Sequence, residues 1–176
     1  MAMPQPLQQL QTRAERKPDF SVTLILTLIV ACLLTVVLLP RYRDYTLKEH
    51  RKLAKFVLEE AMERSRDWQK THPGRRMTSL EDLGYGAAAV YVSADGTVRY
   101  SANLSTVYRV GMFFPITRGA ENCGLIADRA RGGFVLVAEP IQTQRIDTQC
   151  DRLCLGSSGT RQTSGTQSAN KCWNRE

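Results

Sequence analysis

Cysteine is the residue type whose spacing in this sequence carries the clearest chemistry. Four of the five cysteines lie in the second half of the chain, and the fifth lies in an apolar run: Cys123, Cys150, Cys154 and Cys172, with Cys32. None forms a Cys-x-x-Cys pair, and His50 and His72 are far away in sequence, so the tight ligand spacing of a zinc site is missing. Two disulfides are the favoured interpretation, and they require an oxidising compartment. Cys32 is expected to be a free apolar side chain.

Other side chains that could do catalytic chemistry have no supporting pattern in the sequence. His50 and His72 belong to no recognised catalytic motif, and no glycine-rich phosphate loop occurs. The acidic pairs Glu59-Glu60 and Glu81-Asp82 are adjacent in sequence, so their side chains diverge on a helix. We therefore expect no enzyme activity, no cofactor and no metal site.

The charge balance leaves room for an anionic partner. The chain has 24 Lys and Arg against 17 Asp and Glu, which gives a net charge of +7. Such a charge permits binding to nucleic acid but does not require it, and a solvated basic surface is the favoured alternative. Four arginines near the cysteines are the candidate DNA contacts: Arg129, Arg131, Arg145 and Arg152. Aromatic residues do not alternate with them, so stacking onto single strands is not expected.

The only long uncharged run extends from Phe20 to Leu39. A helix of that length spans about 30 Å, which matches the hydrocarbon core of a bilayer. The run ends at Pro40 and charged residues follow at once, whereas a cleaved secretory signal has a shorter apolar core followed by small residues. We interpret residues 20–40 as a retained transmembrane helix and the polar residues 1–19 as a leader or cytoplasmic segment.

Two signals disagree about the orientation of this anchor. Basic residues are more numerous after the run, and counted alone they place the C-terminal side in the cytoplasm. The basic residues before the apolar run are Arg13, Arg16 and Lys17, and those after the run are Arg41, Arg43, Lys48, Arg51 and Lys52. Disulfides would instead require the C-terminal side to lie outside the cytoplasm.

Residues 41–176 are predicted to form a head domain that begins with an amphipathic helix over residues 41–70. Apolar residues three and four apart make its buried stripe: Leu47, Leu53, Phe56, Val57, Ala61, Met62 and Trp68. The breakers at 71–74 end this helix, which directly continues the apolar one, with Pro40 as a bend.

The rest of the head carries strand signals. A connecting region, 71–107, contains a capping box at 78–81, a helix stop at Gly84 and a hairpin around Asp95-Gly96. Two stronger strands are predicted at 108–114 and 134–138 and a further strand at 152–155, within a sheet and disulfide-closed region spanning 108–173. The tail 156–170 is rich in Gly, Ser and Thr, and we expect it to be held only through the cysteine that follows it. The fold class is α+β, with the long helix packed on an antiparallel β-sheet.

The C-terminal third resembles the type IV pilins, and among them the PilE-type minor pilins. The resemblance rests on the spacing F-x-L-x-A-x-P-x-x-x-Q-x-x-D-x-x-C from Phe134 to Cys150, followed by Cys172-Trp173 near the end. The apolar helix, the Leu39-Pro40 step and the amphipathic helix agree with it. One departure concerns the processing site, where Asp19 and Phe20 stand in place of Gly and Phe, and Leu24 stands in place of the family's Glu.

The resemblance implies a structural role. It suggests a minor pilin or pilin-like accessory subunit of a surface filament that serves adhesion, twitching motility or DNA uptake. Its partners would be other pilin subunits through the N-terminal helix, the membrane, the assembly machinery and, less strongly favoured, DNA. It implies a single-pass inner-membrane protein with a periplasmic head, extracellular once assembled. A DNA-binding pilin-like receptor, a secretion-system pseudopilin and an uncleaved membrane-anchored periplasmic protein are the alternatives.

The resemblance also implies a disulfide pairing. Four cysteines allow three pairings. The family pattern favours Cys150–Cys172, which leaves Cys123 with Cys154. Alternation in Leu153-Cys154-Leu155 agrees, since it turns both leucines to the core and Cys154 to the other face.

Overall fold

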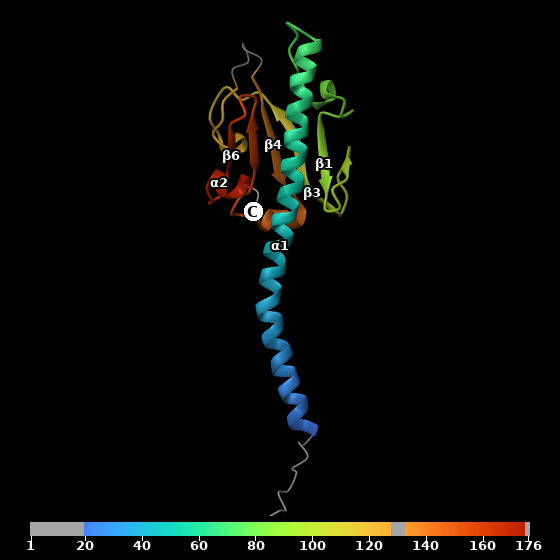
Figure 1. Ribbon diagram of the computed structural model, residues 1–176, viewed down its shortest axis with the longest axis vertical. Helices are drawn as coiled ribbons and strands as arrows, with labels where there is room; N and C mark the ends of the chain where they lie inside the picture. The colour runs from blue at the N-terminus through green and yellow to red at the C-terminus, as the bar shows by residue number, and fades with distance from the viewer. Residues whose placement is uncertain (1–19, 128–132, 175–176) are drawn as a thin grey trace, which may run out of the picture. The chain divides into compact units, whose positions relative to one another are not determined.

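The computed structural model describes residues 20–127 and 133–174 (Figure 1). The chain divides into two compact units at Tyr42 and Arg43. The first contains the apolar part of the long helix, and the second is the head. Each is described by itself.

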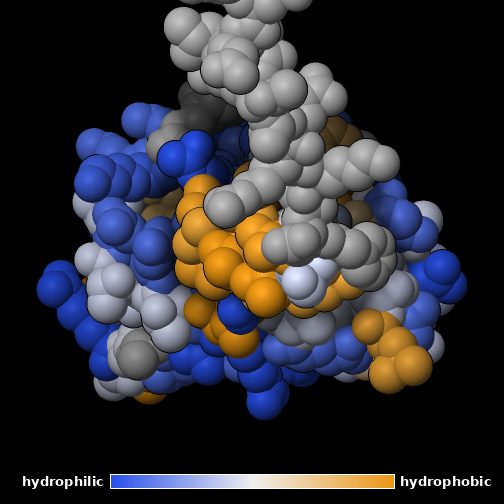
Figure 2. All heavy atoms as spheres, turned by 90° about the horizontal axis from the view of Figure 1, so that it is seen from below, coloured by the Kyte–Doolittle hydropathy of each residue, from blue (hydrophilic) through white to orange (hydrophobic). Residues whose placement is uncertain are grey.

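The helix α1 runs from Phe20 to Thr71 and has Pro40 inside it. Its apolar part has no glycine and many β-branched residues, and its side chains are exposed in the structure. Among the described residues it is the one helix long and apolar enough to cross a membrane. The large orange group at the centre of Figure 2 belongs to this apolar part. The bend predicted at Pro40 stays a prediction.

In the head, the second half of α1 lies across one face of a six-stranded antiparallel sheet (Figure 1). The strand order is β2-β1-β3-β4-β5-β6. The strands are β1 (Ala89–Ser93), β2 (Val98–Arg99), β3 (Thr106–Phe113), β4 (Val135–Pro140), β5 (Leu153–Gly156) and β6 (Arg161–Thr163). Short 3-10 helices, η1 (Leu80–Leu83), η2 (Ala120–Asn122) and η4 (Gln142–Ile146), and the helix α2 (Ala169–Trp173) connect or follow them.

The sheet separates two apolar clusters because side chains alternate along each strand. The main cluster lies under α1 and contains Leu136 and Leu153 with the helix residues Ala54 and Leu58. The smaller cluster lies on the opposite face. It joins Val135, Val137 and Cys154 to Cys123, Leu125 and Ala127. As the alternation predicts, Cys154 faces away from the main core.

Several local predictions are confirmed. The hairpin pairs Tyr91 with Arg99, and its turn uses Gly96 at φ +84°. The helix α1 ends at Thr71, and Gly84 ends η1 in the left-handed conformation. The six-stranded antiparallel sheet and the long helix agree with the predicted α+β class.

Other predictions need correction. Phe56 does not join the buried stripe, because its side chain is 67% exposed; Ala54 and Leu58 face the core instead. The capping box is shifted by one residue, to Ser79 with Asp82. The region 71–107 is not only a connection, since β1 and β2 lie in it and β3 begins in it. The tail 156–170 is also structured, since β6 lies in it and α2 begins at Ala169.

Candidate functional site: the disulfide-closed C-terminal region

The structure joins Cys123 to Cys154 and Cys150 to Cys172, the pairing that the sequence resemblance implies. The Cα–Cα distances are 6.1 Å and 5.7 Å. Cys150 and Cys172 are part of the main core, whereas Cys123–Cys154 belongs to the cluster on the opposite face. Each face of the sheet therefore has one covalent cross-link.

The C-terminal tail is held by backbone pairing as well as by its disulfide. Beyond β6 it runs alongside residues 148–152. Ser164 donates its N–H to the carbonyl of Arg152, and Gln167 donates to that of Gln149 at 2.8 Å. The hydroxyl of Thr163 donates to the carbonyl of Cys150. The buried Trp173 ends the tail and donates its indole N–H to the carbonyl of Gln162 at 2.9 Å. Polar residues are ordered here because their backbones are paired.

Gly165 is required where the two segments meet. A Cβ at this position would lie 2.6 Å from the carbonyl carbon of Cys150 and closer still to the carbonyl group of Gln149. We expect Gly165→Ala to destabilise the head by about 1–3 kcal/mol, as overpacking against backbone does. Gly156→Ala is the control, because its Cβ would meet its nearest neighbours at 3.6–3.7 Å. Urea unfolding followed by tryptophan fluorescence measures both, and equal midpoints would contradict the prediction.

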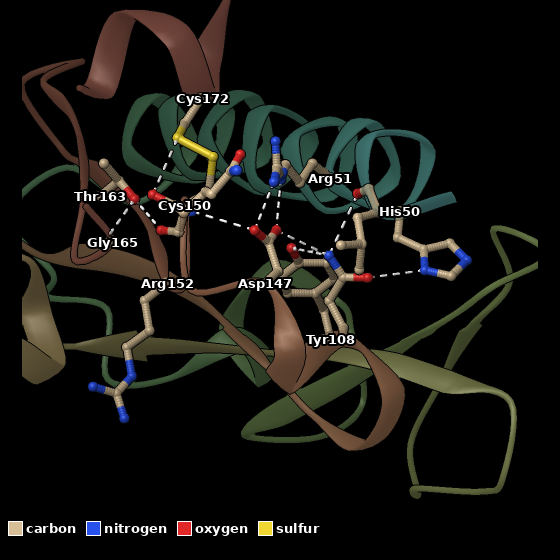
Figure 3. A network of polar contacts seen from close by, with 12 residues as sticks. His50, Arg51, Tyr108, Asp147, Cys150, Arg152, Thr163, Gly165 and Cys172 are labelled. Carbon is tan, nitrogen blue, oxygen red and sulfur yellow. Dashed lines mark hydrogen bonds and ion pairs between the residues drawn. A yellow bond between two sulfur atoms is a disulfide. The ribbon is translucent and has the colours of Figure 1, made fainter. Parts of the chain in front are cut away.

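Gln144 lies at the centre of a buried polar network that links α1 to η4 and the sheet. Its Nε2 donates to the Tyr108 hydroxyl at 3.0 Å and to a carboxylate oxygen of Asp147 at 3.1 Å. Its Oε1 lies 2.9 Å from Nδ1 of His50. Gln144 and Tyr108 are fully buried. Figure 3 shows the partners His50, Tyr108 and Asp147 around this network. Burial raises the pKa of the Tyr108 hydroxyl, and the neighbouring Asp147 charge adds to this effect.

Asp147 forms a two-bond ion pair with Arg51 of α1 (Figure 3). Arg51 Nε lies 2.5 Å from Oδ2, and Arg51 Nη2 lies 2.6 Å from Oδ1. The Asp147 side chain is 0% exposed and that of Arg51 is 11% exposed. Burial opposes the charged form of Arg51, but the hydrogen bond and charge of Asp147 outweigh it, so the pKa of Arg51 is raised. Oδ1 also accepts the backbone N–H of Cys150, which ties the pair to the disulfide.

In the sequence, Gln144 and Asp147 stand out only as positions of the pilin-like motif, and no prediction assigns Arg51 a buried partner. The position of Arg51 in the helix is a sequence signal for burial. Arg51 precedes Ala54 by three positions and Leu58 by seven, so Arg51 shares their helix face. A charged residue on a buried face needs an opposite charge.

Two of the four candidate DNA contacts, Arg145 and Arg152, belong to the described residues. Arg129 and Arg131 lie outside the described residues. Arg152 is paired with Glu139 at 2.9 Å and points away from the buried network (Figure 3). Arg145 is exposed on η4. Arg145 thus lies on η4 and Arg152 directly before β5, and DNA binding stays a prediction.

The candidate processing site is described only in part. Asp19 lies outside the described residues, and Phe20 is the first residue of α1. Across the described parts of the chain, no group of three His, Cys, Asp or Glu side chains is placed to hold a metal ion. No protein-family model matches the chain, and no curated protein matches it significantly.

Proposed function

We propose that this protein is a membrane-anchored structural subunit of the type IV pilin class, acting as a minor pilin or pilin-like accessory subunit of a surface filament. The observation that carries the proposal is α1. One helix has an exposed apolar first part and a second part that packs on an antiparallel sheet. The two disulfides of the C-terminal region add support, because they suit a head outside the cytoplasm.

The helix α1 has two environments, an exposed apolar first part and a second part packed on the sheet of the head. Exposed Leu, Ile and Val side chains need lipid or other apolar helices around them. A subunit that waits in a membrane and then joins a helical bundle uses the same surface for both. The head would be displayed outside, with its helix fixed by the Arg51–Asp147 pair.

Mass spectrometry of the membrane-extracted protein tests this proposal. It reports the N-terminus, any N-methylation and the disulfides together. A chain shortened to begin near Phe20 and recovered in sheared filaments would support a filament subunit. A full-length chain confined to the membrane would favour the alternative, an uncleaved anchored protein.

The departures at Asp19 and Leu24 predict a rare or accessory position. We expect Asp19→Gly combined with Leu24→Glu to increase the processed fraction and the amount in sheared filaments severalfold, since both changes restore the pilin pattern. Asp19→Gly combined with Leu24→Gln is the control for polarity without charge. Immunoblots of membrane and filament fractions measure the outcome. Abundant filaments of the unchanged chain alone would refute the accessory role.

A further inference from the structure

The two disulfides of the head join cysteines that are not neighbours along the chain. In chain order the four cysteines are Cys123, Cys150, Cys154 and Cys172. The first is bonded to the third and the second to the fourth. Joining them in the order in which they are synthesised would instead give Cys123–Cys150 and Cys154–Cys172. The native pairing therefore requires Cys123 to pass over the first partner that becomes available to it.

Chain length gives Cys123 almost no means of choosing between Cys150 and Cys154. These two cysteines are four positions apart, so the loops that they would close with Cys123 differ little in length. The entropy of loop closure changes only slowly with loop length, and it slightly favours the nearer Cys150. The segment around Cys123 adds no preference, because its backbone bonding is local: Ala127 donates its N–H to the carbonyl of Pro115.

The folded head, in contrast, keeps the two competing cysteines on different faces of the sheet. Cys154 lies opposite Val137 of β4 and belongs, with Cys123, to the smaller apolar cluster. Cys150 belongs to the main core under α1. A side chain cannot change face unless the backbone of its strand moves. A Cys123–Cys150 bond therefore takes Cys150 out of the core and prevents the native placement of β5.

The contacts that hold Cys150 in its native place come from the last part of the chain. Gly165 donates its backbone N–H to the carbonyl of Cys150, and Cys172 lies in the final helix α2. Because a chain is synthesised from its N-terminus, these residues appear last. Until they arrive, Cys150 is a free thiol four positions from Cys154, and it competes for Cys123.

The chain can correct this error by itself only for a limited time. In a chain with the Cys123–Cys150 bond, the Cys154 thiolate can attack the sulfur of Cys123 and displace Cys150. Once Cys154 is oxidised with Cys172, the four cysteines of the head offer no thiol. The remaining cysteine, Cys32, lies in the apolar run, where a thiol stays protonated and is not a nucleophile. The mispaired head then needs a thiol from outside.

We propose that this chain is a substrate of a thiol–disulfide isomerase, an enzyme that presents a reduced, nucleophilic cysteine in the compartment of the head. The enzyme thiolate attacks the sulfur of Cys123 and forms a mixed disulfide, which releases the Cys150 thiolate. That thiolate attacks the sulfur of Cys172 and releases Cys154. The Cys154 thiolate then attacks the sulfur of Cys123 and releases the enzyme thiolate. These three exchanges replace both wrong bonds by both native bonds, without net oxidation.

Burial makes the native bonds poor substrates for the same enzyme. Cys150 and Cys172 are each 1% exposed, and Cys154 is 0% exposed. An attacking thiolate needs access to the sulfur, so it cannot reach these three in the folded head. Attack on the half-buried Cys123 would release Cys154, which the smaller cluster keeps in place to restore the bond. The exchange therefore stops at the native pairing.

The test is production of the full chain in bacterial cells that keep their envelope thiol oxidase, with the envelope disulfide isomerase present or deleted. Free thiols are alkylated before extraction, and peptide mapping without reduction gives the bonds. We expect the deletion to lower the natively paired fraction about twofold, since two loops of nearly equal length compete. Peptides that join Cys123 to Cys150 should appear. An isomerase with both active-site cysteines replaced by alanine should not restore the native fraction.

The double variant Cys150→Ser, Cys172→Ser is the matched control. It keeps one possible bond in the head, Cys123–Cys154, so no pairing error can occur there. Its oxidised fraction should be the same in both strains. This comparison separates the correction of disulfides from a general effect of the isomerase on export or folding.

Equal native fractions of the unchanged chain in the two strains would overturn the proposal, and so would an equal dependence of the double variant on the isomerase. The inference rests on the proposed function, which places the head in an oxidising compartment. Free thiols at all four head cysteines in both strains would refute that function itself. A chain recovered in filaments with native bonds in both strains refutes only this inference.

Discussion

Asp147→Asn is expected to destabilise the head by about 3–5 kcal/mol, because it removes the charged partner that is hydrogen-bonded to the nearly buried Arg51 guanidinium. The substitution also turns an amide N–H₂ toward groups that all donate. Asp147 now accepts from Arg51, from Gln144 and from the backbone of Cys150. A loss of this size is a large fraction of the stability of a domain this small.

Urea unfolding of the full chain in detergent measures this effect. Both tryptophans, Trp68 and Trp173, lie in the head, so fluorescence reports on this unit alone. Glu59→Gln is the control. It breaks the Arg161 pair, whose side chains are 39% and 51% exposed, and should cost below about 1 kcal/mol. Arg51→Met with Asp147→Leu removes both charges and should recover most of the loss. Similar costs for Asp147→Asn and Glu59→Gln would refute the role of burial.

The double substitution Cys150→Ser, Cys172→Ser is expected to destabilise the head by about 3 kcal/mol, the chain-entropy value for a loop of this length. The disulfide closes a sequence separation of 22 residues. The tail it holds has few apolar side chains apart from Trp173. We therefore expect the tail from Gly156 onward to loosen while the strands β1 to β4 stay folded.

Hydrogen exchange measures where the loosening occurs. The amides of Gly165 and Gln167, now bonded to the carbonyls of Cys150 and Gln149, should exchange faster. The matched variant is Cys123→Ser, Cys154→Ser, which should instead expose the amides of Gly124 and Ala127. Identical exchange patterns in the two variants would show that the disulfides do not act on separate segments.

The parts of the head that could be predicted depend on side-chain pattern. The Asp95-Gly96 turn and the Gly84 stop are local signals, since glycine alone adopts those backbone angles easily. Cys154 was placed correctly because alternation is obligatory in a strand. The prediction that Phe56 is buried is wrong. The spacing of apolar residues along a helix does not distinguish positions at the edge of the core from positions at its centre.

Other parts depend on contacts between distant segments. The residues of β6, Arg161–Thr163, are polar and form a strand only because their backbones pair with β5. Arg51 and Asp147 are 96 positions apart, and only the fold brings them together. The disulfide pairing came from the family resemblance, since spacing alone leaves three choices.

The order of the linked cysteines along the chain has a mechanical consequence. The bridges Cys123–Cys154 and Cys150–Cys172 interleave, so tension applied to the two ends crosses the first bridge, returns from Cys154 to Cys150 and crosses the second. Between Cys123 and Cys172 only that short return can lengthen, to about 14 Å when fully extended. A pulling force would therefore stretch the chain before Cys123 and leave the rest at nearly constant length. A subunit under tension would therefore hardly lengthen between Cys123 and Cys172. Its extension would be confined to the helix α1 and the strands β1, β2 and β3.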